Sequence, residues 1–180
     1  MAEEINMDLR IQRTKAAIKK AFLELRSKKP IEKITITELS AHANINKATF
    51  YLHYSDIYEL SDEIEGEMID EMIVSGLENF FEAPQRYSLE IFGAFMENRK
   101  KLKTIFSGSR SGLFSIKIEQ RIKAKLYEKY PELNTKHNDV VLSFLTQGMF
   151  HTVAGCREED IGKLYDEIVQ LLPLLVGQLR

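Results

Sequence analysis

The segment from Ile34 to Tyr54 constrains the fold more than any other part of the chain, because it carries closely spaced start and stop signals for helices. Thr35 and Glu38 have the spacing of a capping box, in which the threonine hydroxyl accepts from the N–H of Glu38 and the carboxylate reaches back to the N–H of Thr35. Asn44 stands where a left-handed residue would end such a helix. We therefore predict a short helix from Ile36 to about Ala43, followed by a tight turn.

A second short helix is predicted directly after the turn. Asn46 is a favourable N-cap, and the helix that it begins would run from Lys47 to about Tyr54. Helices of this length are unstable alone in water, so another element must support them. The preceding segment offers one apolar helical face, made by Ile18, Ala21, Phe22 and Leu25. We expect Phe50 to point into the same core, which gives a three-helix unit with its last helix exposed on one side.

Charge is distributed unevenly along the chain. The 180 residues carry a net charge of −2, yet the segment 10–55 holds ten Lys and Arg against three Glu, which leaves +7 there and −9 elsewhere. A basic surface alone is equally consistent with an ordinary solvated face. Combined with two short helices joined by a tight turn, it favours binding to nucleic acid.

The region from about Arg10 to Leu60 resembles the DNA-binding domain of the TetR family of bacterial transcriptional regulators. The residues that carry the resemblance are Ile34, Thr35, Leu39, Ala43, the run 46–51, His53, Tyr54 and Leu60. Two positions depart from the family pattern. Asn44 stands where the family usually has Gly, and Ile57 stands where the family often has a Lys that meets a phosphate.

The resemblance implies which residues contact double-stranded DNA. Lys47 and Ala48 would face base edges, since a lysine can donate to guanine and an alanine can touch a thymine methyl. Thr49 and Tyr51 would orient on phosphates. The full predicted DNA-binding set is Thr35, Asn46, Lys47, Ala48, Thr49, Tyr51 and His53. A homodimer would place two such helices about one turn of DNA apart, or somewhat further, on a near-palindromic operator.

The rest of the sequence shows no sustained period-two alternation and predicts further helices. We expect them at 56–81, 87–106, 113–130, 138–156 and 160–179, with a loop at 107–112 and an arm outside the helices at residues 1–9. The predicted fold is therefore all-α, with a helix-turn-helix head at 8–55 joined by a long helix to a helical ligand-binding and dimerisation body at 56–180.

The last two predicted helices are apolar on most sides, which indicates either a central position or cover by a partner. Gly148 would allow a close approach between helices. We interpret the pair as a dimer interface that forms a four-helix bundle with its symmetry mate, and an ordinary internal core is the alternative. The predicted interface residues are Val141, Phe144, Leu145, Gly148, Met149, Ile168, Leu171, Leu172 and Leu175.

Aromatic residues in the body could line an apolar pocket for a small-molecule effector, or could equally be core. The candidates are Phe92, Phe95, Phe106, Phe114, Tyr127 and Phe144. The run from Leu102 to Phe114 and the helix around Gly148 resemble a short C-terminal sensor domain of a TetR subgroup, although the Trp common in that subgroup is absent here. The resemblance implies a regulator, usually a repressor, that a ligand releases from DNA.

Other classes of protein fit the sequence less well. Cys156 is the only cysteine, so no internal disulfide or cysteine metal cluster is possible, and we expect neither metal nor cofactor. There is no run of the ~18 apolar residues of a membrane span and no signal-peptide pattern, which predicts a cytoplasmic protein. No catalytic arrangement is recognisable, so we expect no enzyme. The remaining alternative is a TetR-like co-regulator that acts through protein contacts without binding DNA itself.

Overall fold

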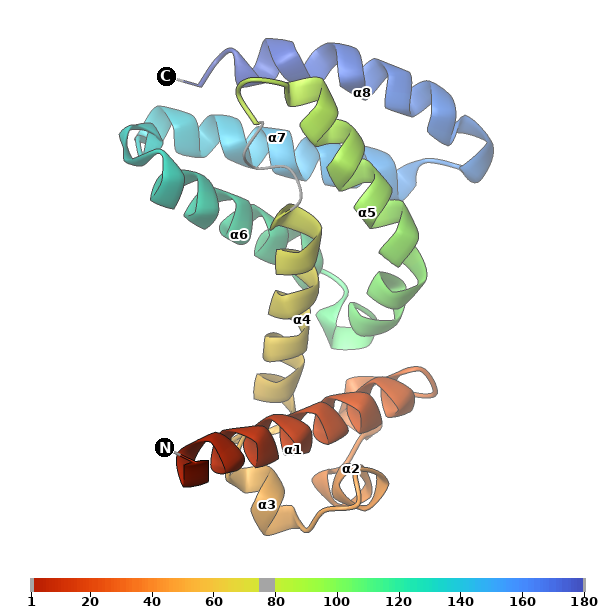
Figure 1. Cartoon of the computed structure of the whole chain (residues 1–180). Coiled ribbons are helices and arrows are strands. Elements are labelled where there is room, and N and C mark those ends of the chain that lie inside the picture. Colours follow the sequence, from red (N-terminus) through yellow and green to blue (C-terminus); the bar gives the residue numbers. More distant parts are fainter. Residues whose placement is uncertain (1, 75–79, 180) are drawn as a thin grey trace. The chain divides into compact units, whose positions relative to one another are not determined.

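A computed structural model describes residues 2–74 and 80–179 of the chain. Those residues form helices and turns with no strand, which confirms the predicted all-α fold (Figure 1). The α-helices are α1 (Ala2–Arg26), α2 (Ile36–His42), α3 (Lys47–Tyr51), α4 (Ile57–Val74), α5 (Pro84–Ile105), α6 (Leu113–Lys129), α7 (Lys136–Gly155) and α8 (Ile161–Val176).

Most helix boundaries lie within three residues of their predicted positions, and two differ further. Residues 2–9, predicted as an arm, are the first turns of α1. The helix predicted at 56–81 is described as far as Val74; residues 75–79 of it lie outside the described residues, and Phe80 and Phe81 are in a turn. Pro84 is the first residue of α5, where its missing N–H breaks no helical hydrogen bond.

The chain divides into two compact units. The first contains Met1–Gly66 and Lys101–Ser111, and the second contains Glu67–Lys100 and Gly112–Arg180. Segments 56–66 and 101–111 therefore pack with the residues predicted as the head. Both α4 and α5 run through the division, so each of these two helices contributes residues to both units.

The core of the first unit is the one that the apolar spacing predicts. Ile18 and Phe22 of α1, Leu39 of α2 and Phe50 of α3 have no exposed surface. Burying side chains of this size contributes roughly 1.5–3 kcal/mol each, and the core holds α2 and α3, which are too short to be stable separately, against α1. Ile11, which continues the same spacing toward the N-terminus, is exposed.

Arg26 fastens the end of α5 to the first unit. Its side chain is buried at the end of α1, and Nη2 donates to the carbonyl oxygens of Thr104 at 2.9 Å and Ile105 at 2.7 Å. The last carbonyls of a helix have no partner within the helix. A buried guanidinium therefore takes the place that water or a glycine cap would otherwise fill.

Arg110 supplies a second anchor nearby. It lies in the 3₁₀ turn η3 (Gly108–Arg110), which begins at a glycine with φ of +64°. The carboxylate of Glu65 in α4 has no exposed surface and accepts from Arg110 Nε at 2.8 Å and from Nη2 at 2.6 Å. Ser61 donates to the same carboxylate at 2.7 Å. Burial opposes the charge of Arg110, but hydrogen bonds to Glu65 and Asp62 outweigh it and raise the pKa of the guanidinium.

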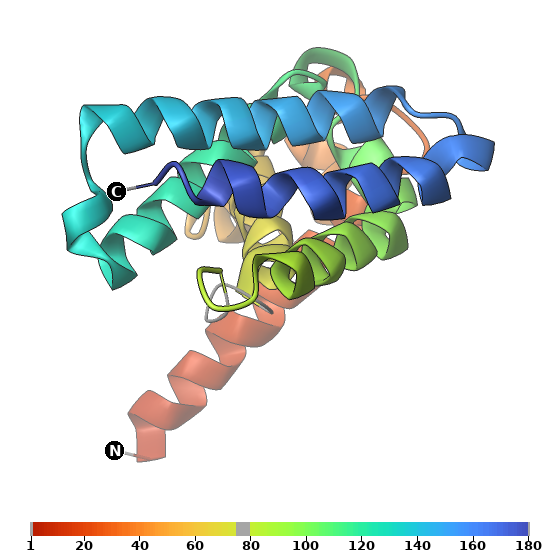
Figure 2. The same ribbon diagram turned by 90° about the horizontal axis from the view of Figure 1, so that it is seen from above.

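The second unit is built from parts of α4 and α5 together with α6, α7 and α8. Helix α7 packs against α6 on one side and α8 on another, and α7 and α8 run side by side (Figure 2). Nε2 of His137 at the start of α7 lies 3.1 Å from the carbonyl oxygen of Gln178 beyond the end of α8, so the two helices are antiparallel. In the described ranges, no helix is long and apolar enough to cross a membrane.

We predict that Arg110→Met destabilises the protein by about 3–5 kcal/mol, because it leaves the carboxylate of Glu65 buried without its partner. The double variant Arg110→Met/Glu65→Met should recover most of that loss, since it removes both charges together. Arg121→Ala is the control, because this half-exposed residue pairs with Asp70 at 3.6 Å and should cost less than about 1 kcal/mol. Urea unfolding followed by circular dichroism measures all three. If Arg110→Met lowered the free energy of unfolding no more than Arg121→Ala does, the role of Arg110 as an anchor would be contradicted.

Candidate functional site

The turn between α2 and α3 has the geometry that its sequence predicts. Thr35 Oγ1 accepts from the N–H of Glu38 at 3.2 Å, which caps α2. Asn44 has φ of +54°, the left-handed conformation expected of it, and the N–H of Ile45 then closes on the carbonyl of Ser40 at 2.9 Å. A hydrogen bond from Lys29, at 2.5 Å, is the largest influence that lowers the pKa of Glu38 and keeps the carboxylate charged beside the cap.

Asn46 starts α3 and also engages the side chain of Thr49. Its Oδ1 accepts from the backbone N–H of Thr49 at 2.7 Å and from the Thr49 hydroxyl at 2.9 Å. The single hydroxyl proton of Thr49 is thereby occupied. To donate to a phosphate, this hydroxyl would have to leave the cap, while the amide bond that begins the helix could remain.

Helix α3 has one buried and one exposed side. Phe50 is fully buried, and its ring centroid lies 5.7 Å from that of Tyr54, which is also buried. Lys47 and Ala48 are exposed on the other side, and so is Tyr51, with 55% of its surface accessible. The structure thus brings the predicted DNA-binding residues together at one end of the first unit: Thr35, Asn46, Lys47, Ala48 and Tyr51 are exposed, while Thr49 and His53 are half-buried.

Leu52 is a feature of this surface that the sequence analysis missed. It follows α3 as its C-cap and is 82% exposed, more than any other large apolar side chain among the described residues. It stands four residues after Ala48, so helical spacing places the two on one side. The available signal was its position between Phe50 and Tyr54: a leucine two residues from each of two core aromatics points away from that core.

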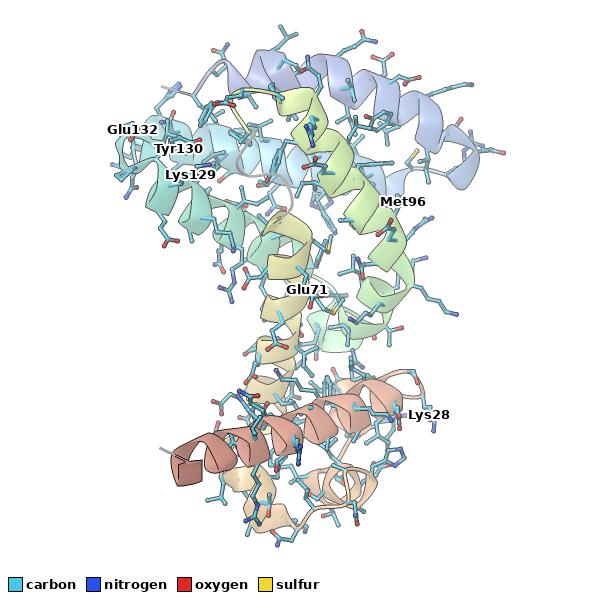
Figure 3. The ribbon with its side chains drawn as sticks, in the orientation of Figure 1. Lys28, Glu71, Met96, Lys129, Tyr130 and Glu132 are labelled. Carbon is cyan, nitrogen blue, oxygen red and sulfur yellow. The ribbon has the colours of Figure 1, made fainter. Side chains whose placement is uncertain are left out.

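The basic surface of the first unit is smaller than the count of charges suggests. Lys15 and Lys19 both pair with Glu63, at 2.9 and 2.6 Å, Lys29 pairs with Glu38, and Arg26 is buried. Six of the ten basic residues in segment 10–55 are exposed, namely Arg10, Arg13, Lys20, Lys28, Lys33 and Lys47. Figure 3 shows Lys28 in the turn at the end of α1.

The second unit contains an apolar pocket of about 100 Å³. Five helices contribute to its wall, with most of the residues coming from α5, α6 and α7. Three of the six predicted pocket aromatics line it, namely Phe92, Phe95 and Phe114. Three further rings line it that were not among the predicted residues, namely Phe80, Tyr87 and Phe150.

The other three predicted aromatics are not in the wall of this pocket. Phe106 is buried in the first unit, next to the end of α5. The hydroxyl of Tyr127 lies 3.5 Å from Asp139, and neither residue lines the pocket. Phe144 is 78% exposed. All six residues are aromatic, and only the three-dimensional packing shows which of them line the pocket, which are in a core and which are on the surface.

The outer side of α7 and α8 carries a set of exposed apolar side chains. Phe144 is the most exposed of them, and Leu174 follows at 68%. The others are Val140, Leu171 and Leu175. On α7 they recur at a four-residue spacing that continues to Gly148, where a Cβ atom would meet nothing within 4 Å. The chain therefore leaves an apolar stripe uncovered across two adjacent helices.

The predicted interface residues differ in their exposure. Phe144, Gly148, Leu171 and Leu175 are exposed on this stripe, and Val141 and Met149 are half-buried. Leu145, Ile168 and Leu172 point inward, where Leu145 and Leu172 help to line the pocket. Val140 and Leu174 are exposed on the same helices and were not among the predicted interface residues.

The residues that the structure describes contain no group of three or more His, Cys, Asp or Glu side chains placed to hold a metal ion.

Comparisons with known proteins found similarity to transcriptional regulators. No family model matches the sequence. The fold is similar to the crystal structure of a TetR transcriptional regulator from Streptococcus agalactiae 2603V, with a TM-score of 0.63 and 25% identity over 92% of this chain and 98% of that one. The uncharacterised HTH-type transcriptional regulator YxbF of Bacillus subtilis (strain 168) is 36% identical over 84 residues. That match covers 44% of this chain and 22% of the relative, so the chain spans about a fifth of its length.

We predict that Asn46→Ala lowers the free energy of unfolding by about 1 kcal/mol, because the substitution removes the acceptor that caps α3. Asn46→Ser should retain most of the stability, since serine supplies a capping oxygen at the same position. Asn134→Ala, at an exposed asparagine outside any α-helix, is the matched control and should change little. Thermal and urea unfolding measure these effects, and equal losses for Ala and Ser would contradict the cap as their source.

Proposed function

Because the chain belongs to the TetR family of transcriptional regulators, we propose that it binds double-stranded DNA through α3 and represses transcription from a near-palindromic operator. The observation that carries this proposal is the two-sided character of α3. Its buried side, at Phe50, holds the helix rigidly in the first unit, and its exposed side presents Lys47, Ala48 and Tyr51 outward. A helix held in this way can enter a major groove without rearrangement of the core.

The exposed residues divide by chemistry into base and phosphate contacts. Lys47 is a donor suited to the O6 and N7 acceptors of guanine, and Ala48 can touch a thymine methyl. Leu52 extends that apolar contact by one turn. Tyr51 donates its hydroxyl to a phosphate, which fixes the register of the helix. Neutralisation of phosphates by the six exposed basic residues then supplies the salt-dependent part of the affinity.

We infer a homodimer from the apolar stripe on α7 and α8. Monomeric proteins rarely expose contiguous apolar patches of large size, and a two-fold axis would let the stripe bury itself against its own copy as a four-helix bundle. Gly148 supports this arrangement, because a residue with open space above its Cα allows a partner helix to approach closely. Two α3 helices in one dimer would match the two halves of the operator.

A ligand in the pocket of the second unit would control DNA binding. We infer that helix α5 connects the pocket to the unit that contains α3. Its first half lines the pocket with Phe92 and Phe95, and its last carbonyls are held by Arg26 in the unit that contains α3. A ligand that favours one position of α5 would therefore bias the DNA-binding unit.

We predict that Lys47→Ala/Tyr51→Ala weakens binding to the DNA upstream of its own gene by about 100-fold or more, since each lost contact costs roughly 1–3 kcal/mol and a dimer loses each twice. The slope of affinity against salt should also become shallower. The matched control is Lys129→Ala/Tyr130→Ala at the end of α6 (Figure 3), which removes the same residue types and charge from the second unit. Fluorescence anisotropy at two salt concentrations measures both variants.

Wild-type protein without specific DNA affinity, equal to the Lys47/Tyr51 variant across the upstream region and genomic fragments, would contradict direct DNA binding. That result would favour the alternative of a co-regulator that acts through protein contacts.

We predict that Phe144→Asp converts the dimer to a monomer, because it places two charges in the centre of the apolar bundle, where an unpaired charge is strongly unfavourable. Stability of the isolated fold should be nearly unchanged, since Phe144 is exposed. Ile116→Asp, at another exposed apolar residue of the second unit, is the control and should leave the dimer intact. Sedimentation velocity gives the mass of each variant. A wild-type monomer, or a Phe144→Asp dimer, would contradict this interface.

A further inference from the structure

The side of α3 that faces directly away from the core is apolar. Successive residues of an α-helix are turned by about 100°, so the midpoint between Ala48 and Leu52 lies about 180° around the helix from Phe50. Phe50 has no exposed surface, whereas Ala48 is exposed and Leu52 is 82% exposed. Lys47 and Tyr51 lie to one flank of this pair. The side chains that point most directly outward from α3 are therefore two that form no hydrogen bond.

Leu52 keeps this position although α3 ends one residue before it. Its backbone has φ of −71° and ψ of −18°, the right-handed helical conformation, and its N–H donates to the carbonyl oxygen of Ala48 at 3.1 Å. This hydrogen bond joins residues four apart, as the bonds within an α-helix do. Leu52 therefore stands one turn beyond Ala48 on the same side.

The place of Leu52, more than its exposure, gives it a function. An exposed leucine taken alone is ordinary on a protein surface. Leu52, however, is centred on the side of the helix that enters the major groove under the proposed function. The groups that its side chain meets there are the edges of bases.

The major groove offers one apolar group to such a side chain. The C5-methyl of thymine lies there, whereas the N7, O6, O4, N6 and N4 atoms of the bases are hydrogen-bond acceptors or donors. A leucine over one of those polar atoms displaces water and supplies no partner, which is unfavourable. Over a thymine methyl, the same side chain gains from the burial of apolar surface. The pair formed by Ala48 and Leu52 therefore favours thymine.

Helix geometry also sets the distance between the two contacts. Four residues of an α-helix span about 6 Å along its axis, and base pairs stack about 3.4 Å apart. A helix that follows the groove would thus meet two methyl groups about one or two base-pair steps apart.

We propose that Ala48 and Leu52 read thymine methyl groups, so that each half of the operator carries two thymines about one or two base-pair steps apart. Leu52 makes the larger contribution, because its side chain is longer and buries more apolar surface. This inference rests on the proposed function, since it needs α3 in the major groove. It adds the class of base sequence that the protein selects and the residue that selects it.

The test removes the methyl groups and leaves the base pairing intact. A duplex that the wild-type protein selects from a random library is synthesised with thymine or with uracil throughout, and fluorescence anisotropy gives both affinities. Loss of one buried methyl group weakens binding about fourfold, and a dimer meets each contact twice. Wild type should therefore bind the uracil duplex about tenfold or more weakly, and Leu52→Ala should reduce this penalty to less than about threefold.

Two controls separate a methyl contact from other effects. Leu89→Ala truncates a leucine that is 50% exposed in α5 and belongs to the second unit, so it should keep the full uracil penalty. The penalty in wild type should be equal at two salt concentrations, because a methyl contact releases no counterions, whereas loss of a phosphate contact changes the salt slope. Circular dichroism should show Leu52→Ala folded like wild type, since Leu52 is exposed.

A gain of specificity gives an independent measurement. An arginine can donate two hydrogen bonds to the O6 and N7 atoms of guanine. Leu52→Arg should therefore select from the same library duplexes in which guanine replaces thymine at one position of each half-site.

The outcomes distinguish this inference from the proposed function. Equal wild-type affinity for the thymine and uracil duplexes, an equal penalty in wild type and Leu52→Ala, or unchanged selection by Leu52→Arg would each overturn the inference, while the selected duplex would still uphold specific DNA binding. Wild-type protein that selects no duplex from the library would overturn both.

Discussion

A carboxylate with no exposed surface needs hydrogen-bond partners from the protein in place of water, and Arg110 and Ser61 supply them to Glu65. The bidentate contact from Arg110 places the loop after α5 against α4. Arg26 does the same for the last turn of α5 from the end of α1. The two buried arginines thus convert a distant stretch of sequence, residues 101–111, into part of the unit that holds α3.

This arrangement gives α5 two roles. Its early residues form part of the wall of an apolar pocket, and its final carbonyls accept hydrogen bonds from the guanidinium of Arg26 in the first unit. Under the proposed function, α5 and the long α4 are the helices through which a ligand in the pocket would act on the unit that holds α3. Movement of the end of α5 away from Arg26 would be unfavourable, since a buried guanidinium that loses its carbonyl partners keeps its full desolvation cost.

Local signals predicted the helix-turn-helix closely because each is read within a few residues. The caps at Thr35 and Asn46 and the left-handed Asn44 depend only on side-chain hydrogen bonds and on φ. The sequence predicts a helix to about Tyr54, whereas α3 ends at Tyr51; Tyr54 is buried although it lies outside the helix.

The sequence by itself determined the all-α fold, the position of the turn and the face of α1 that forms the core, because periodicity and capping act over short distances. Tertiary structure decided which apolar residues of α7 and α8 face inward and which remain on the surface, as Leu145 and Phe144 illustrate. It also decided that Tyr87 rather than Tyr127 lines the pocket. Both helices are apolar on more than one side, so only their neighbours, α5 and α6, distinguish the sides.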